Sequence, residues 1–276
     1  MVYSLSVRLF AVAKGETVTR CALWRCVCVV VLLGVPAAAW AQADEIQVYD
    51  GGLAKVKQFN LTLHNNFTPN GIKTPAFPGG VTPDKSLNGV PEWALGVTKW
   101  FEAGLYLPLY SYDKNMGFGY NGFKLRSLFA VPNADDRTFF YGANFEFSIN
   151  AKRWDTTHFT SEVRPIIGWH LGRLDVIFNP ILDTAYDGLA NLDFAPSTRI
   201  AWNPSEKCAI AVEEYADFGP VSDFHSGSEQ SHQIYGVIDY NFKSLSLEAG
   251  VGFGLTSASD KVTLKLILSY DFNKKD

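Results

Sequence analysis

The chain has 276 residues, with 24 basic and 28 acidic side chains. This slightly acidic balance argues against a nucleic-acid partner and against a polybasic module for membrane surfaces. The length fits one barrel or two small soluble domains, so the fold class must come from the pattern of residues.

The first forty residues have the order of a secretory signal peptide. Arg20 and Arg25 precede an apolar run over residues 26–38, and Ala39-Trp40-Ala41 supplies a small-x-small cleavage signature. The run is about 13 residues long, whereas a membrane-spanning helix needs roughly 20. We therefore expect residues 1–41 to be a signal peptide that is cleaved before Gln42 during export.

Cleavage would change both the charge and the cysteine content. Residues 1–41 contain four of the 24 basic and one of the 28 acidic side chains, so the mature chain has a net charge of −7. Of the four cysteines, the mature chain keeps only Cys208. It can therefore form neither an intrachain disulfide nor a cysteine-based metal site.

The mature chain shows a repeated strand pattern. It has no continuous apolar stretch of the roughly 18 residues that indicate a membrane helix. Instead, apolar and polar residues alternate with period two over short segments that Gly, Pro, Asn and Asp separate. In chain order, we predict strands at 59–64, 92–97, 101–109, 120–131, 139–149, 158–170, 174–185, 193–202, 208–218, 230–240, 245–255 and 262–272.

The lengths of the connections add independent information. Long connections at 68–90 and 219–229, and a medium one at 111–119, alternate with tight turns at 99–100 and 171–173. Outer-membrane barrels have this asymmetry, with short turns at one rim and long loops at the other. The sequence therefore predicts an all-β, antiparallel, up-and-down transmembrane barrel of twelve strands.

This fold divides the chain into four parts. The signal peptide covers 1–41, an N-terminal periplasmic segment covers 42–56, the barrel covers 57–272 and a tail covers 273–276. Aromatic residues near the predicted strand ends would form girdles at the two membrane interfaces. They are Trp93, Trp100, Phe101, Tyr110, Trp169, Trp202, Tyr240, Phe242 and Phe272.

A secreted soluble β-sandwich or barrel is the alternative fold. In a sandwich, the apolar face of each sheet would meet another apolar face and the polar face would meet water. Here the polar faces hold many small residues and isolated charges, and the apolar faces are rich in aromatics. That arrangement suits a barrel whose outer face meets lipid and whose inner face is polar.

Two features depart from a regular strand pattern. Four prolines fall inside or near predicted strands, where each removes a ladder hydrogen bond. We expect bulges or strand ends at Pro108, Pro165, Pro180 and Pro196. The adjacent Glu213 and Glu214 would point to opposite faces, so one of them should lie at a rim or beside a bulge.

The hairpin over residues 96–108 resembles one in a family of outer-membrane proteins. It has a strand that ends in Gly-x-Thr, a tight turn, and then Glu-x-Gly-Leu and Pro. The family is that of the MetA pathway of phenol degradation, whose members are transporters proposed for catabolic pathways. The resemblance implies a barrel over about 42–276 and uptake or export of small, aromatic compounds, and it implies no catalytic residues.

The terminal strand resembles the assembly signal of outer-membrane proteins. Its apolar residues alternate up to the aromatic Phe272, although residues 273–276 follow that aromatic here. The resemblance implies the barrel-assembly machinery as a partner, together with outer-membrane lipids.

The polar faces of the predicted strands give the side chains that would line the lumen. The acidic candidates are Glu92, Glu102, Glu146, Glu162, Asp175, Asp183, Glu213, Asp217, Asp239 and Glu248. The basic candidates are Lys124, Arg126, Arg164, Arg199 and Lys265. Opposite charges could pair across neighbouring strands and fill a narrow barrel, or they could line a water path and favour cations or polar neutral solutes.

The five histidines offer few sites for chemistry. Asp223, His225 and Ser226 are the nearest approach to a hydrolytic triad, but they lie in a Gly/Ser-rich loop that we expect to be solvated. His225, Glu229 and His232 match no compact metal motif. We therefore predict no catalytic residue, no metal and no cofactor.

Together these features predict a passive outer-membrane channel for small, aromatic solutes. The first and fifth long loops would fold over its mouth and set selectivity. The alternatives are an outer-membrane enzyme that acts on lipid and a closed structural or adhesive barrel. The sequence leaves the solute, the direction of transport and the oligomeric state open.

Overall fold

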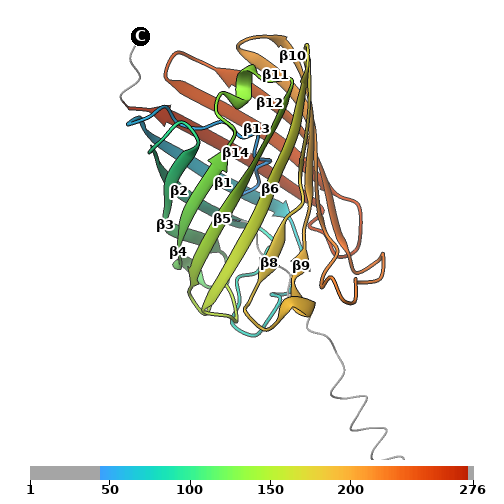
Figure 1. The fold of residues 1–276 in the computed structure, drawn as a ribbon. Helices are drawn as coiled ribbons and strands as arrows, with labels where there is room; N and C mark the ends of the chain where they lie inside the picture. Colours follow the sequence, from blue (N-terminus) through green and yellow to red (C-terminus); the bar gives the residue numbers. More distant parts are fainter. Residues whose placement is uncertain (1–43, 273–276) are drawn as a thin grey trace, which may run out of the picture. The chain divides into compact units, whose positions relative to one another are not determined.

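The computed structural model describes residues 44–272, which form a closed antiparallel barrel (Figure 1). The predicted signal peptide at 1–41 and the predicted tail at 273–276 lie outside the described residues. Helix in the described range is limited to the 3-10 turns η1 (Ala134–Asp136) and η2 (Leu189–Asn191). In this range, no helix has the length and apolarity to cross a membrane.

The wall consists of twelve strand positions, as the sequence predicted. Two of these positions each hold two short strands that follow one another along the chain, β7 with β8 and β9 with β10. The strands are β1 (Phe59–Asn70), β2 (Ser86–Gly96), β3 (Phe101–Asp113), β4 (Gly117–Ala130), β5 (Phe139–Asn150), β6 (Phe159–Leu171), β7 (Leu174–Asn179), β8 (Leu182–Thr184), β9 (Asp193–Phe194), β10 (Ser197–Ser205), β11 (Cys208–Asp217), β12 (Ser231–Asn241), β13 (Leu245–Gly254) and β14 (Val262–Asp271).

The first and last strands close the barrel. β1 pairs with β2 on one side and with β14 on the other, where Leu61 lies opposite Tyr270 and His64 lies opposite Ile267. β5 pairs with both β4 and β6. Closure pairs the backbone within the sheet, which is the condition for strands to lie in hydrocarbon.

The connections define two different rims. We call the end with 97–100, 131–138, 172–173, 206–207 and 242–244 the turn rim. The opposite end, the loop rim, carries 71–85, 114–116, 151–158, 185–192, 218–230 and 255–261. The medium connection predicted at 111–119 is instead a tight turn at 114–116, because β3 and β4 extend farther than the sequence indicated.

Three of the four prolines mark one irregular region of the wall. Pro180 separates β7 from β8, and Pro196 separates β9 from β10. Pro165 stays within β6, where it pairs with Ala143. β6 pairs with β8 up to residue 163 and with β7 from residue 167, so the proline faces the interruption between them. The expected strand ends at Pro180 and Pro196 are confirmed.

Pro108 lies at a bulge that reverses the face of the residues after it. The register of β3 against β4 shifts between Tyr106 and Leu109. Strict alternation of side chains along the predicted strand 101–109 places Leu109 on the outer face with Leu105 and Leu107, and this placement is wrong. Leu109 is fully buried and packs with Tyr106 and Val90. An inserted residue changes which face each later residue occupies, because side chains alternate along a strand.

The pair Glu213 and Glu214 needs no bulge. β11 pairs with β12 in unbroken register across both residues. Glu213 is buried on the inner face, while Glu214 is exposed and lies 3.2 Å from Nδ1 of His232, measured from Oε1. Glu214 is close to the loop-rim end of β11, so the rim position that we expected for one of the two is confirmed.

The outer face is broadly apolar and is ringed by aromatics. Ile200 and Val212 are half exposed in mid-strand, as residues that face lipid should be. Near the turn rim, Phe59 stacks on Trp93 at 5.9 Å between ring centroids, and Trp100 stacks on Phe129 at 6.0 Å. Such aromatics suit a membrane interface.

Gly168 provides a test of the inner packing. The ring of Phe140 lies on this glycine, and a Cβ at residue 168 would come within 2.0 Å of Phe140 Cζ. We expect Gly168→Val to prevent barrel formation, measured as loss of the heat-modifiable band in electrophoresis. A Cβ at Gly236 would meet nothing within 4 Å, so Gly236→Val should keep the band. Equal behaviour of the two variants would contradict this packing.

Candidate functional site in the lumen

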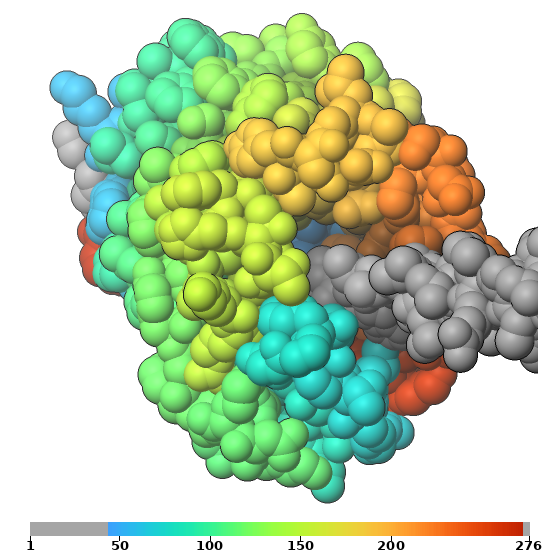
Figure 2. Space-filling view, turned by 90° about the horizontal axis from the view of Figure 1, so that it is seen from below, coloured from blue at the N-terminus to red at the C-terminus, as the bar shows by residue number. Residues whose placement is uncertain are grey.

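Residues 44–54, which we call the plug segment, run inside the barrel wall. We expected residues 42–56 to lie in the periplasm, and the structure differs from this expectation. Asp44, Ile46, Val48 and Tyr49 are all buried. Figure 2 looks onto the loop rim, and blue atoms of this segment are visible at the bottom of the hollow between the loops.

The wall holds the plug segment by its acidic side chains and by its backbone. Asp44 lies 2.9 Å from the Lys124 ammonium, and Glu45 lies 3.4 Å from the Arg164 guanidinium. Arg164 also donates to the Gln47 carbonyl at 3.0 Å. Lys265 donates to the Ile46 carbonyl at 3.3 Å.

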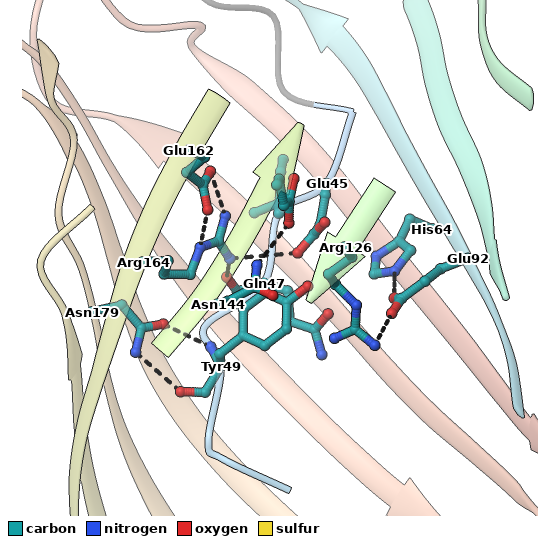
Figure 3. Close-up of polar contacts among 12 residues, drawn as sticks. Glu45, Gln47, Tyr49, His64, Glu92, Arg126, Asn144, Glu162, Arg164 and Asn179 are labelled. Carbon is teal, nitrogen blue, oxygen red and sulfur yellow. Dashed lines mark hydrogen bonds and ion pairs between the residues drawn. The ribbon is translucent and has the colours of Figure 1, made fainter. Parts of the chain in front are cut away.

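Asn179 of β7 binds the plug backbone in both directions. The Tyr49 N–H donates to Asn179 Oδ1 at 2.7 Å, and Asn179 Nδ2 donates to the Tyr49 carbonyl at 3.0 Å (Figure 3). A side-chain amide can replace a neighbouring strand in this way, since it offers one donor and one acceptor. Thus the segment is anchored without extending the sheet.

Two apolar clusters of the inner wall pack against the plug segment. Val48 and Tyr49 lie in the first cluster, whose wall residues are Leu128, Phe140, Ile166 and Ile177. Ile46 lies in the second, whose wall residues are Ala201, Ala211, Tyr235 and Val237. These wall residues face inward in a lumen that is largely polar, and their apolar side chains match those of the plug segment that covers them.

One network of charges follows β1 to β4. Arg126 lies between two carboxylates, at 2.7 Å from Glu92 and in contact with Glu102. Glu92 also lies 3.1 Å from Nε2 of His64, which is fully buried. Glu102 in turn accepts from the Ala54 N–H at 2.5 Å, which ties this network to the plug segment.

A second network joins the five strands β10 to β14. Arg199 contacts Glu213 and Asp239 and lies 3.7 Å from Glu248. Lys265 contacts Glu213 and lies 2.5 Å from Glu248. Each cation is shared among carboxylates, so no single pair accounts for the network.

The remaining predicted residues lie in smaller groups. Lys124 is 3.2 Å from Glu146, and Arg164 is 2.6 Å from Glu162. Asp175 accepts from Asn203 at 2.6 Å and lies 2.7 Å from His170 near the turn rim. Asp183 lies opposite Glu162 on β6, and Asp217 accepts from the Gly219 N–H at 2.8 Å near the loop rim.

All of the predicted lumen-lining residues are buried or half-buried in the structure. The buried ones are Glu92, Glu102, Arg126, Glu146, Arg164, Arg199, Glu213 and Lys265. The half-buried ones are Lys124, Glu162, Asp175, Asp183, Asp217, Asp239 and Glu248. Most of them make ion pairs with one another or with the plug segment.

Sequence reasoning missed the residues that complete the site. Asp44, Glu45 and Tyr49 lie in the segment that we placed outside the barrel, and Asn179 was treated only as part of a strand. One signal was present in the sequence. Inward apolar residues such as Ile166 and Ile177 interrupt the polar face, and an apolar patch of this kind indicates a partner inside the lumen.

The first long loop is fixed at its base. The Ile72 N–H donates to Asp260 at 2.8 Å, and the Gly71 N–H donates to Asp84 at 3.2 Å. The hydrogen bond from the Lys73 ammonium holds the pKa of the Asp84 carboxyl below its ordinary value. Burial raises the pKa of the Asp260 carboxyl, although the bond from Ile72 opposes that shift.

The loop residues considered for catalysis have other partners. Ser226 donates its hydroxyl to Glu229 at 2.7 Å. His232 lies beside Glu214 and Gln230. In residues 44–272, no group of His, Cys, Asp or Glu side chains has the arrangement of a metal site.

Comparisons with known proteins support the fold. No family model and no curated protein matches the sequence. The crystal structure of the COG4313 outer membrane channel from Pseudomonas putida F1 is similar, with a TM-score of 0.55, 11% identity, and coverage of 83% of this chain and 100% of that one. This chain therefore has the fold of an outer-membrane β-barrel.

Two other solved structures are more distant. The translocator domain of the autotransporter NalP from Neisseria meningitidis has a TM-score of 0.41 and 9% identity, and covers 93% of this chain and 98% of its own. LpxR from Salmonella typhimurium has a TM-score of 0.41 and 7% identity, with coverage of 77% and 100%. Membership of the MetA-pathway family stays a prediction.

Lys265 provides a test of the second network. Its side chain and that of Glu213 are both fully buried, so Lys265→Met would leave Glu213 without one of its two cations. We expect a loss of about 3–5 kcal/mol in the free energy of unfolding, as for a broken buried ion pair. Urea unfolding in liposomes, followed by tryptophan fluorescence, measures it.

The control for that test is Lys207→Met, which changes an exposed lysine at the turn rim. It should leave the unfolding free energy within a few tenths of a kcal/mol of the wild type, roughly the effect of an ordinary surface change. Equal loss in both variants would show that the network does not stabilise the barrel.

Asp84 provides a test of the first loop. A carboxyl with a lowered folded pKa contributes stability above its unfolded pKa, about 3.9 for Asp, and that contribution disappears as the pH falls through the folded value. The contribution is therefore present at neutral pH. We expect Asp84→Asn to speed tryptic cleavage after Lys73 at pH 7. Asp223→Asn, in another exposed loop, should leave that rate unchanged.

Proposed function

We propose that the protein is a passive outer-membrane channel for small solutes, aromatic ones among them. The observation that carries this proposal is the polar inner face of a closed barrel, on which charged side chains from eleven of the twelve strand positions line one lumen. A barrel that served only as an anchor would gain nothing from placing so many charges away from water, since each must be desolvated and paired. The fold shared with a known outer-membrane channel supports the proposal.

The plug segment makes the conformation described here a closed or narrowed one. It is held by side chains and is not a strand of the wall, so it can leave the lumen without breaking the ladder between any two strands. The channel, its solutes, the assembly machinery and the absence of enzymatic activity are all part of this proposal.

Conductance across a planar bilayer tests the proposal. The inner wall has more carboxylates than basic groups, so we expect cations to permeate in preference to anions, measured as the reversal potential in a KCl gradient. A purified, heat-modifiable barrel without conductance and without solute flux into liposomes would remove the channel proposal.

Deleting residues 44–50 tests the role of the plug segment in the same apparatus. The deletion removes Asp44 and Glu45, which pair with Lys124 and Arg164, together with Tyr49, and it leaves every wall strand intact. We expect single-channel conductance at least several-fold above that of the full mature chain. Unchanged conductance would show that the segment does not limit the pore.

The alternative of a lipid-hydrolysing barrel has its own test. Ser226 and His225 lie in the loop 218–230 of the loop rim, so an enzyme would lose lipid hydrolysis on Ser226→Ala while its conductance stayed the same. We expect no hydrolysis by the wild type in the first place, measured as release of fatty acid from vesicles.

A further inference from the structure

The side chain of Tyr49 lies against a set of inward wall side chains, which we call the Tyr49 seat. Its ring lies between two guanidinium groups, 4.6 Å from the Cζ of Arg164 and 5.7 Å from that of Arg126, measured to the ring centroid (Figure 3). A cation near the face of an aromatic ring is attracted by the electron density there, and the attraction is larger where water is excluded. The ring is almost completely buried.

The rest of the seat fits a phenol. The Tyr49 hydroxyl shares a hydrogen bond of 2.5 Å with the hydroxyl of Tyr106, which is fully buried. Apolar wall side chains complete the seat, namely Leu128, Phe140, Ile166 and Ile177. A hydroxylated ring therefore finds a polar partner, two cations and an apolar surface in one place.

These wall residues belong to the five strands β3 to β7, so the seat does not depend on the plug segment for its construction. The plug segment contributes Tyr49, whose side chain occupies the seat. That side chain is a phenol, and it is bound by residues of the wall.

We propose that the Tyr49 seat is a binding site for small phenolic solutes and that Tyr49 is an internal competitor for it. A phenol with one ring would make the contacts that Tyr49 makes here, once the plug segment has moved away. Wall carboxylates offset the positive charges of the two guanidinium groups, with Glu92 and Glu102 beside Arg126 and Glu162 beside Arg164. The meaning of the site for transport rests on the proposed channel function.

Binding of 4-methylphenol, which has the shape of the tyrosine side chain, tests the seat. We use the full mature barrel with Tyr49→Ala, which empties the seat. We expect 4-methylphenol to raise the thermal midpoint of this variant by several degrees in a concentration-dependent way. Toluene, which lacks the hydroxyl, should raise it less, and the wild type should shift least because its own tyrosine competes.

Tyr235→Ala is the matched control. Tyr235 is another fully buried inward tyrosine, and it lies in the second apolar cluster with Lys265 near its ring at 5.8 Å. Its hydroxyl bonds Gln233 and its ring lacks the pair of guanidinium groups. Equal stabilisation of both variants by 4-methylphenol would indicate general cavity filling and overturn the proposal.

A second measurement covers the case in which Tyr49→Ala fails to fold. In a Cys208→Ser background, Gln47→Cys places one thiol on the plug segment, where it reports movement of that segment. We expect 4-methylphenol to increase the rate of maleimide labelling several-fold, since the solute displaces Tyr49. In that case an unchanged labelling rate overturns the proposal by itself.

Failure of the seat and failure of the channel are distinguishable. Both readouts measure binding and do not depend on conductance. A barrel that conducts but does not bind 4-methylphenol leaves the channel proposal standing without the seat. A barrel that binds it but passes neither ions nor solutes leaves the seat and removes the channel.

Discussion

The pairing of β1 with β14 is the constraint on which the rest of the structure depends. Without it, two strands would present unpaired N–H and C=O groups to hydrocarbon, where each unsatisfied group costs several kcal/mol. Closure fixes which face of every strand meets lipid and which face meets the lumen. Any charge on the inner face must then be solvated by water or neutralised by a neighbour inside a confined space.

The barrel meets this requirement with shared cations and with its own N-terminal segment. Arg126, Arg199 and Lys265 each lie among more than one carboxylate. The plug segment brings Asp44 and Glu45 to Lys124 and Arg164, and it covers the inward apolar side chains. The inward side chains of the wall and the side chains of the plug segment therefore match in charge and in apolar character. The pairing of the strands, in contrast, needs only the wall.

Much of the wall could be predicted from the sequence. Strand positions follow from period-two alternation, and this signal is local, so β5, β13 and β14 appear close to where it places them. Bulges are harder, because a proline shows that a ladder bond is missing but not how the register recovers. Leu109 was misplaced for that reason: one inserted residue moved it from the outer face to the inner one.

The site itself was less predictable. The inward charges could be listed, but their partners depend on the relative stagger of strands far apart in sequence, such as Glu213 and Lys265. The plug segment precedes the first predicted strand and is too short to be recognised as a strand of the wall, so the sequence offered no direct reason to place it in the lumen. Only the inward apolar residues Leu128, Ile166 and Ile177 hinted that something covers them.

The covalent link between the plug segment and β1 has a quantitative consequence. Tyr49 is tethered by about ten residues to the start of the wall, so its concentration near its own seat is that of a linked ligand, on the order of millimolar for a short flexible connection. A free solute that binds the seat as tightly as Tyr49 does must reach a concentration comparable with this effective concentration. A solute that binds more tightly needs a proportionally lower concentration. The length of the tether would thus set the solute concentration above which Tyr49 is displaced from its seat. Displacement of the plug segment would then depend on how concentrated the solute is.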